Sequence, residues 1–364
     1  MKAVEPACYF GNKEYIVITI KKTEALSAVK KVMPGVENGS TIIEGADAIV
    51  FTGESIHSYN DSISVSVPFD SGEVKGVFKG MDLFRLLQKL PEEDIQFEPA
   101  KSGVAMKSGN AEVTINSVES DLQEYLEGLG ISKLKWKSVP KDFWEGIRLC
   151  KISCSTSSTR GIFITDKLMM STDGIRLNYY DLNESFDTCW VDDPAWTELL
   201  RLPGKITEYS VTESWIHFRN EERVVFSAKR KEDEYYPTER MLALREMVKV
   251  EENDIQCALP KDLDKVIDRV AVLSEDINNF SAISITVSPK EMVLESHRVS
   301  GKIRERVPFP KALEIENPFH FKADADFLIE AVRKVPNFYY KEGETPAVLF
   351  QSEQFTQIMA TVNE

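Results

Sequence analysis

The chain has 364 residues, of which 42% are hydrophobic and 28% charged, and its net charge at pH 7 is −15. This is the composition of ordinary folded domains, and the length suffices for two or three of them. The sequence has no apolar run of 18 residues and no apolar signal-peptide core near its start, so we expect a cytoplasmic protein without membrane contact. The acidic balance disfavours indiscriminate binding to nucleic acid, although a local basic surface can still bind DNA.

Cysteine and histidine spacing predicts neither a disulfide framework nor a metal site. The five cysteines include no Cys-x-x-Cys pair. Cys150 and Cys154 are four residues apart on an expected helix, but no third or fourth ligand is near them in the sequence. The four histidines are scattered and match no catalytic signature. We therefore expect no metal, no cofactor and no catalytic residues.

A unit recurs three times along the chain, with a period of about 120 residues. Each unit begins with an amphipathic helix, expected to start at Thr23, at residues 139–142 and at residues 259–262. The second and third starts share Pro-Lys-Asp, in which proline suits the first helical turn and aspartate complements the positive helix end. Acidic, tyrosine-bearing linkers at 119–125 and 232–237 separate the units. The predicted domains are residues 1–127, 128–246 and 247–364.

The same order of elements follows in each unit. Two β-type runs flank a short polar connection at residues 41–53, 159–177 and 281–296. In the middle unit we expect Asp166-Lys167 to be the tight connection and Asp173-Gly174 to supply a further bend. A second helix with an acidic start and an aromatic residue then precedes more strands. This order predicts an α+β fold in which each of three repeated domains packs two helices on antiparallel sheets.

The expected helices carry cations opposite their apolar positions. In the third unit Leu263, Val266, Ile267 and Val270 form an apolar stripe at i, i+3, i+4 and i+7. The other side carries Lys261, Lys265 and Arg269. A solvated face is the ordinary explanation of such charges. Cations on six helices of an acidic chain nevertheless indicate a shared surface suited to phosphates. The candidates are Lys30, Lys31, Arg85, Lys89, Lys141, Arg148, Lys151, Arg201, Lys261, Lys265, Arg269, Arg333 and Lys334.

The segment Thr-Asp-Gly-Ile-Arg-Leu at residues 172–177, preceded by Arg-Gly-Ile-Phe at 160–163, resembles the most recognisable motif of the bacterial sliding clamp, the β subunit of DNA polymerase III. Two further segments, 236–242 and 321–335, are similar to that family's second-to-third-domain connection and its final helix. The resemblance implies three clamp domains per chain and a homodimer whose six domains close a ring around double-stranded DNA. It also implies a non-enzymatic accessory subunit whose partners are the replicative polymerase and a clamp loader.

In this family, clients insert a short peptide into an apolar cleft between the second and third domains. Carried onto this sequence, the cleft would be lined by Thr172, Gly174, Ile175, Arg176, Leu177, Pro237, Met241, Leu242, Phe280, Phe327, Ile358, Met359 and Ala360. Ile175 stands in place of the family's usual histidine, Thr159 in place of a common leucine, and the last residues, 360–364, also depart. These departures indicate a divergent clamp with an altered client peptide.

Two other classes of function are compatible with the residues. One is a repeat-built scaffold for protein partners without DNA encirclement, because the basic surface is inferred from helix faces alone. The other is a nucleic-acid-modifying enzyme. The acidic clusters at 92–94 and 251–254 are better explained as loop and helix-cap residues than as catalytic carboxylates, which disfavours the enzyme.

Overall fold

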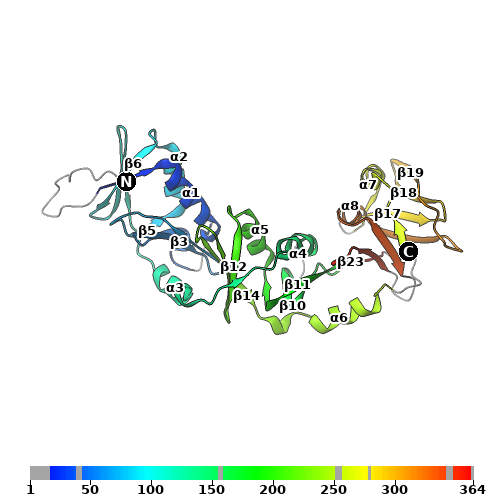
Figure 1. The fold of residues 1–364 in the computed structure, drawn as a ribbon. Coiled ribbons are helices and arrows are strands. Elements are labelled where there is room, and N and C mark those ends of the chain that lie inside the picture. Colours follow the sequence, from blue (N-terminus) through cyan, green and yellow to red (C-terminus); the bar gives the residue numbers. More distant parts are fainter. Residues whose placement is uncertain are drawn as a thin grey trace. The chain divides into compact units, whose positions relative to one another are not determined.

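The computed structural model describes residues 17–37, 43–154, 159–250, 256–277, 280–341 and 347–361, without the side chains of 275–277 and 280. The chain forms two compact units, Met1–Val139 with Pro194–Lys231 and Pro140–Asp193 with Glu232–Glu364. The fold is α+β, with helices packed on antiparallel sheets, as predicted (Figure 1). No helix in the described ranges has the length and apolar character needed to cross a membrane. The division into three domains stays a prediction.

The first unit contains two antiparallel sheets. One has the order β1-β6-β7-β8, from β1 (Ile18–Lys21), β6 (Asp94–Ala100), β7 (Gly103–Ser108) and β8 (Ala111–Asn116). The other runs β9-β12-β13-β14-β4-β3-β2-β5, from β2 (Ala48–Phe51), β3 (Ser55–Tyr59), β4 (Ile63–Pro68), β5 (Gly76–Lys79), β9 (Lys137–Ser138), β12 (Ile206–Val211), β13 (Trp215–Asn220) and β14 (Val225–Lys231). Its helices are α1 (Lys22–Val32), η1 (Met33–Gly35), α2 (Gly80–Lys89), α3 (Leu122–Gly128), η2 (Ile131–Lys133) and α5 (Asp193–Arg201), of which Asp193 alone belongs to the second unit.

The second unit also contains two antiparallel sheets. One has the order β15-β21-β22-β23-β11-β10, from β10 (Ile162–Thr172), β11 (Arg176–Val191), β15 (Gln256–Ala258), β21 (Asn337–Lys341), β22 (Ala347–Gln351) and β23 (Phe355–Ala360). The other has β16 (Glu275–Ile277), β17 (Phe280–Val287), β18 (Glu291–Arg298) and β19 (Gly301–Pro308) in that order, with β20 (Phe319–Asp324) paired to β17. The helices are α4 (Phe143–Cys150), η3 (Lys151–Ser153), η4 (Asp233–Tyr235), α6 (Thr238–Met247), α7 (Leu263–Ala271) and α8 (Ala325–Val332).

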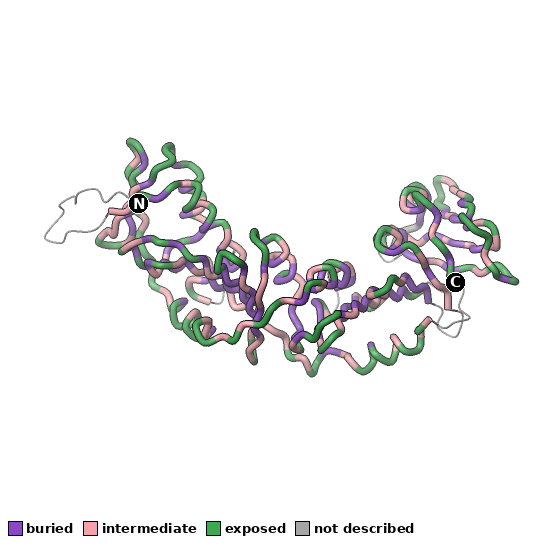
Figure 2. Tube along the Cα trace, in the orientation of Figure 1, coloured by how far each residue is buried: buried purple, intermediate pink, exposed green. Residues whose placement is uncertain are grey.

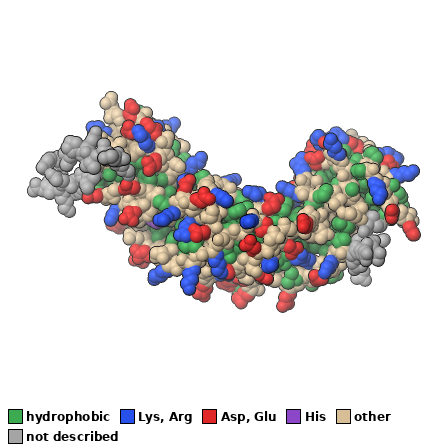
Figure 3. Space-filling view, in the orientation of Figure 1, with side chains coloured by type: hydrophobic (Ala, Val, Ile, Leu, Met, Phe, Trp, Pro, Cys, Tyr) green, Lys and Arg blue, Asp and Glu red, His purple; other side chains and the backbone are tan. Residues whose placement is uncertain are grey.

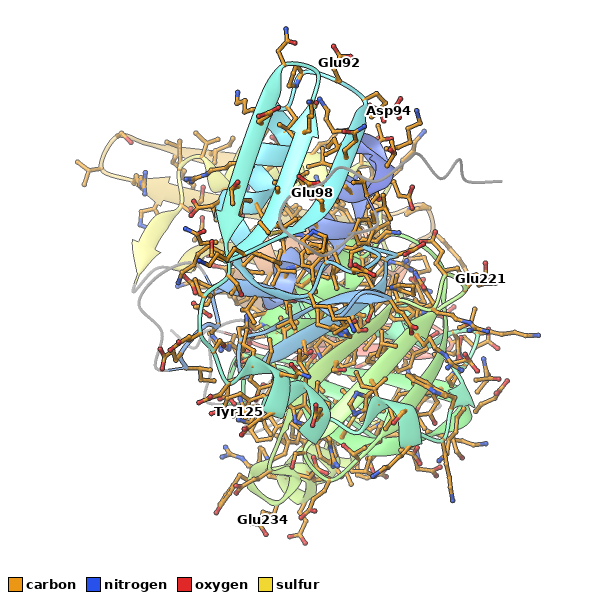
Figure 4. The ribbon with its side chains drawn as sticks, turned by 90° about the vertical axis from the view of Figure 1, so that its left-hand side faces the viewer. Glu92, Asp94, Glu98, Tyr125, Glu221 and Glu234 are labelled. Carbon is orange, nitrogen blue, oxygen red and sulfur yellow. The ribbon has the colours of Figure 1, made fainter. Side chains whose placement is uncertain are left out.

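The predicted helices are present, but their starts differ from the prediction. Thr23 is not the cap of α1, which begins one residue earlier. Instead Glu93 Oε1 accepts hydrogen bonds from Thr23 N at 3.1 Å and Thr23 Oγ1 at 2.6 Å. The 92–94 cluster therefore does contribute a helix cap, and Figure 4 shows its other members, Glu92 and Asp94, where β6 begins. Pro140 and Pro260 lie three residues before α4 and α7, outside their first turns.

The predicted connection at Asp166-Lys167 is wrong. β10 continues through both residues and pairs with β11 on either side of them. The register shifts next to Asp166, whose φ is +47°, so the polar pair forms a β-bulge rather than a turn. The turn lies at residues 173–175, where Gly174 has a φ of +90° and supplies the predicted bend.

The strand pair predicted at residues 281–296 is confirmed, whereas the one predicted at 41–53 is only partly described. In the third repeat β17 and β18 form the predicted pair of strands. In the first repeat residues 41 and 42 lie outside the described residues and 43–47 form a turn, so β2 is the one strand described there.

The two predicted linkers contain helices. The first contains α3, and the second contains η4 and leads into α6, which Figure 2 shows as largely exposed. Helical linkers were not predicted, because neither carries a continuous apolar stripe.

A serine hydroxyl binds the end of the first helix in each repeat. Ser58 Oγ donates to the Val32 carbonyl at 2.6 Å, and Ser171 Oγ donates to that of Cys150 at 2.5 Å. Ser296 Oγ donates to the Val270 carbonyl, also at 2.5 Å. All three serines are buried. The last carbonyl groups of a helix lack partners within it, so these hydroxyls satisfy groups that would otherwise be buried without a donor.

Replacing any of these serines by alanine should lower the free energy of unfolding. Ser171→Ala leaves a buried carbonyl unsatisfied, at a cost of about 1–3 kcal/mol. Ser214→Ala, at an exposed position, is the matched control and should change stability by less than about 0.5 kcal/mol. Urea denaturation followed by circular dichroism measures both. Equal midpoints for the two variants would show that the hydroxyl does not support the helix end.

Candidate partner-binding site

The turn between β10 and β11 is fixed by its own side chains. Asp173 Oδ1 accepts hydrogen bonds from Ile175 N at 3.0 Å and Arg176 N at 2.7 Å. Thr172 Oγ1 accepts from Gly174 N at 3.0 Å and donates to the Arg176 carbonyl at 2.7 Å. An aspartate that binds the backbone two and three residues ahead stabilises a tight turn, and glycine tolerates the positive φ at its centre. The turn therefore holds Ile175 in one place, half-buried.

The C-terminal strand lies directly beside this turn. β23 pairs with β11 so that Met359 faces Arg176 and Ile358 faces Leu177, and Ala360 N donates to the Ile175 carbonyl at 3.0 Å. The structure thus brings together residues 175–177 and 358–360, which are far apart in the sequence.

Part of the predicted cleft gathers on one face of this sheet. Successive residues of a strand point to opposite faces, so Leu177 and Ile358 share a face. Both belong to a hydrophobic cluster with Met241 of α6, which is buried and receives a hydrogen bond from Tyr179 Oη to its carbonyl at 2.5 Å. The cluster also contains Phe163, Met170, Trp190, Tyr236, Ala347 and Leu349. Leu177 is only partly buried, so the cluster extends to the surface.

Two further predicted cleft residues are accessible at α6. Pro237 is half-buried just before the helix, and Leu242 is 38% exposed within it. Phe280 begins β17, and its side chain lies outside the described residues.

Arg176 lies on the opposite face and is built into the fold. Its Nε donates to Asp173 Oδ2 at 2.8 Å and its Nη2 donates to the Ile152 carbonyl at 2.8 Å. Its Nη1 donates to Glu330 of α8, and the guanidinium lies 3.7 Å from the centre of the Phe327 ring. Only 5% of the Arg176 side chain is exposed. Arg176 therefore connects the turn to η3 and α8, and little of its side chain is accessible to a partner peptide.

Thr172 and Met359 are also buried, with their side chains inside the sheet's packing. The members of the predicted lining that remain at least partly accessible are Gly174, Ile175, Leu177, Pro237, Leu242, Phe327 and Ala360. The accessible part of the predicted cleft is therefore apolar.

A cavity of about 300 Å3 opens beside the same cluster, at the end of α6. The sequence did not indicate it, because its walls come from α6 and from two strands about 100 residues further on. Its lining consists of Arg245, Glu246, Val248, Lys249, Val250, Leu349, Gln351 and Thr356.

The described residues contain no group of three or more histidine, cysteine or acidic side chains arranged to hold a metal. Cys150 and Cys154 are buried, and burial raises the pKa of both thiols. Thiols with raised pKa values are poor nucleophiles at neutral pH. Cys154 Sγ donates to Asp193 Oδ1 at 3.1 Å, which is a structural contact.

The cations predicted to face DNA fall into two groups. Within the described residues, one group makes ion pairs: Lys31 with Glu222, Arg148 with Glu145, Lys151 with Asp193, Arg201 with Glu198, Lys265 with Asp262, Arg269 with Glu305 and Arg333 with Asp264. The other group is exposed and makes no ion pair to any described residue: Lys30, Arg85, Lys89, Lys141, Lys261 and Lys334. Figure 3 shows basic and acidic side chains interleaved on the visible face. Arg333 and Lys334 lie just past the end of α8 and not within it.

No model of a protein family matches the chain, and no curated protein matches its sequence. Solved structures do match it. The DNA polymerase sliding clamp of Bacillus subtilis superposes with a TM-score of 0.80 at 18% identity, and the DNA polymerase III β chain of Streptococcus pneumoniae with 0.79 at 15%. The Helicobacter pylori β clamp bound to a DNA ligase peptide gives 0.74 at 16%. Each match covers 96% of this chain and 100% of the other.

The chain has the bacterial sliding-clamp fold. The likeness lies in the path of the backbone over nearly the whole chain, while sequence identity stays below 20%. The resemblance noted at residues 172–177 thus marks a turn that belongs to a complete sliding-clamp fold.

Replacing Arg176 by methionine should destabilise this part of the sliding-clamp fold. The change leaves the Asp173 carboxylate, 5% exposed, without its cation, and breaking such a buried pair costs about 3–5 kcal/mol. Glu330→Gln removes a partner that is half exposed and should cost less than about 1 kcal/mol. Chemical denaturation of the full chain measures both changes. If Arg176→Met unfolds at the wild-type denaturant concentration, Arg176 does not hold the turn.

Proposed function

We propose that the protein is a DNA sliding clamp, a ring-shaped processivity factor that encircles double-stranded DNA and tethers the replicative polymerase. The observation that supports this most strongly is the sliding-clamp fold over 96% of the chain. In this role the protein is an accessory subunit of a DNA polymerase and not an enzyme. It acts in the cytoplasm, with a clamp loader to open and close the ring.

The proposed ring consists of two chains, each with clamp domains at residues 1–127, 128–246 and 247–364. Head-to-tail pairing needs open sheet edges, and β8 and β19 are two of several edge strands in the described residues. Among the described strands, β8 pairs with β7 alone and β19 pairs with β18 alone. An unpaired edge strand is a template for a strand of another chain. Val272, next to α7 and near β19, is 69% exposed.

The proposed contact with DNA uses the exposed helix cations that have no ion-pair partner among the described residues. Lys141 and Lys261 hold corresponding positions before the first helices of two repeats. Contacts to phosphates are independent of base sequence and weaken with salt, so they support the duplex without fixing its register. In this account, the closed ring and not tight binding keeps the clamp on DNA.

A protein scaffold without DNA encirclement is the second candidate. It is favoured by the net charge of −15 and by the ion pairs that neutralise many of the helix cations. It shares the partner site with the first proposal but predicts no topological link to DNA.

The proposed client site is the accessible apolar surface around Leu177, Ile175 and Leu242. An apolar surface with few polar groups suits a short peptide with apolar side chains. A dissociation constant in the micromolar range, or about 8 kcal/mol, suits a site that must exchange clients. Ile175 stands where the resemblance implies a histidine, so the preferred peptide should be more apolar there.

Leu177→Ala should weaken binding of a polymerase-derived peptide at least about tenfold, because it removes the part of the hydrophobic cluster that reaches the surface. Met247→Ala is the control, since Met247 lies on the same helix as Leu242, is 74% exposed and is outside the predicted lining. Fluorescence anisotropy with a labelled peptide measures both affinities. Wild-type affinity in Leu177→Ala, with the fold intact by circular dichroism, would place the client site elsewhere.

A further inference from the structure

The first unit contains a cavity of about 850 Å3, and three of the cations predicted to face DNA, Lys30, Lys31 and Arg201, are among its walls. It lies among the end of α1, η1, the turn between β3 and β4, α2 and α5. Its walls include Lys30, Ile63, Phe84, Arg201 and Leu202. The volume falls in the range of about 300–1,000 Å3 that is typical of ligand pockets.

The turn at this cavity repeats the turn at the candidate partner site. Asn60 Oδ1 accepts hydrogen bonds from Ser62 N at 3.2 Å and Ile63 N at 2.8 Å, as Asp173 Oδ1 does from Ile175 N and Arg176 N. The central residues, Asp61 and Gly174, both have positive φ, at +69° and +90°. The helix-capping serines Ser58 and Ser171 each precede their turn by two residues. Ile63 therefore occupies the position in the first repeat that Arg176 occupies in the second.

The difference between Arg176 and Ile63 accounts for the different space beside the two turns. That space is filled in the second repeat and open in the first. In the second repeat the Arg176 side chain fills the space between its turn, η3 and α8. In the first repeat Ile63 is too short to cross the corresponding space between its turn, η1 and α5. Asn60 Nδ2 reaches η1 instead, donating to the Pro34 carbonyl at 3.3 Å. By this correspondence the cavity includes the space that Arg176 fills one repeat later, and at about 850 Å3 it extends well beyond the size of one side chain.

The chemistry of the walls selects an acidic, amphipathic occupant. Lys31 pairs with Glu222, and Arg201 pairs with the wall residue Glu198. Lys30 is therefore the wall cation that has no ion-pair partner among the described residues. The remaining walls include Phe84 and Leu202, which offer apolar surface. A nucleic-acid backbone would pair with the cations but would gain little from these apolar walls. A peptide that carries a carboxylate beside an apolar side chain complements both.

We propose that this cavity is a second partner site, which binds a short acidic peptide segment of another protein through an apolar anchor and a carboxylate that pairs with Lys30. The site is separate from the Leu177 surface, and its assignment does not rest on the proposed clamp function.

Isothermal titration of the full chain tests the assignment with two capped heptapeptides. In one, two glutamates flank a leucine and a phenylalanine; in the other, glutamines replace the glutamates. The acidic peptide should bind at least about tenfold more tightly than its neutral counterpart. Lys30→Glu should weaken it about tenfold or more, and Ile63→Phe should do the same by filling the cavity. Lys89→Glu, an exposed and unpaired position outside the cavity walls, should leave binding unchanged, as should Leu177→Ala.

Three outcomes would overturn the proposal: binding of neither peptide, equal binding of both, or binding that is unaffected by Lys30→Glu. A further contrary result would be a duplex oligonucleotide that loses affinity in Lys30→Glu while the acidic peptide does not bind, which would make the cavity part of a DNA surface. Lys30 is exposed, so Lys30→Glu decides the question even if Ile63→Phe does not fold.

Discussion

The hydrogen bond from a strand serine to the end of a neighbouring helix is the constraint on which each repeat depends. A helix that ends against a sheet must find donors for its last carbonyl groups. Ser58, Ser171 and Ser296 supply one in each repeat. In the second repeat the same strand pair supplies two more, since Asn178 Nδ2 donates to the Leu149 carbonyl at 2.9 Å and Arg176 Nη2 donates to that of Ile152. The segment around residues 172–177, which carries the family resemblance, therefore helps to hold the end of α4 and η3.

Once the serine and the turn are fixed, the residue that follows the turn is free to differ between repeats. Arg176 fills the space before α8, while Leu177 packs into the hydrophobic cluster on the other face of the sheet, where we propose the client site. Ile63 leaves the corresponding space open as a cavity. A repeated scaffold can thus acquire separate sites by changing one side chain, without altering the backbone turn that carries it.

The sequence predicts those features that depend on local pattern. The apolar stripe of α7 and the Asp-Gly bend are local, and both are confirmed. The bulge at Asp166 could not be predicted, because Asp-Lys suits a turn equally well and the strand continues only through its pairing with β11. Helix α6 has one buried residue, Met241, so it lacks the stripe that would reveal it. Arg176 is buried by contacts with Phe327, Glu330 and Ile152, and Glu330 lies 154 residues away in the sequence, so no local pattern reports these contacts.

In the proposed function the ring is linked to DNA topologically and is not held by affinity. The direct measurement is to load the protein onto nicked circular DNA with a clamp loader, isolate the complex by gel filtration and then cut the circle once. Encirclement predicts that the protein stays on the circle at moderate salt and leaves through the free ends after linearisation. Equal retention on circular and linear DNA, or no retention on either, would contradict the account and favour a scaffold that does not enclose DNA.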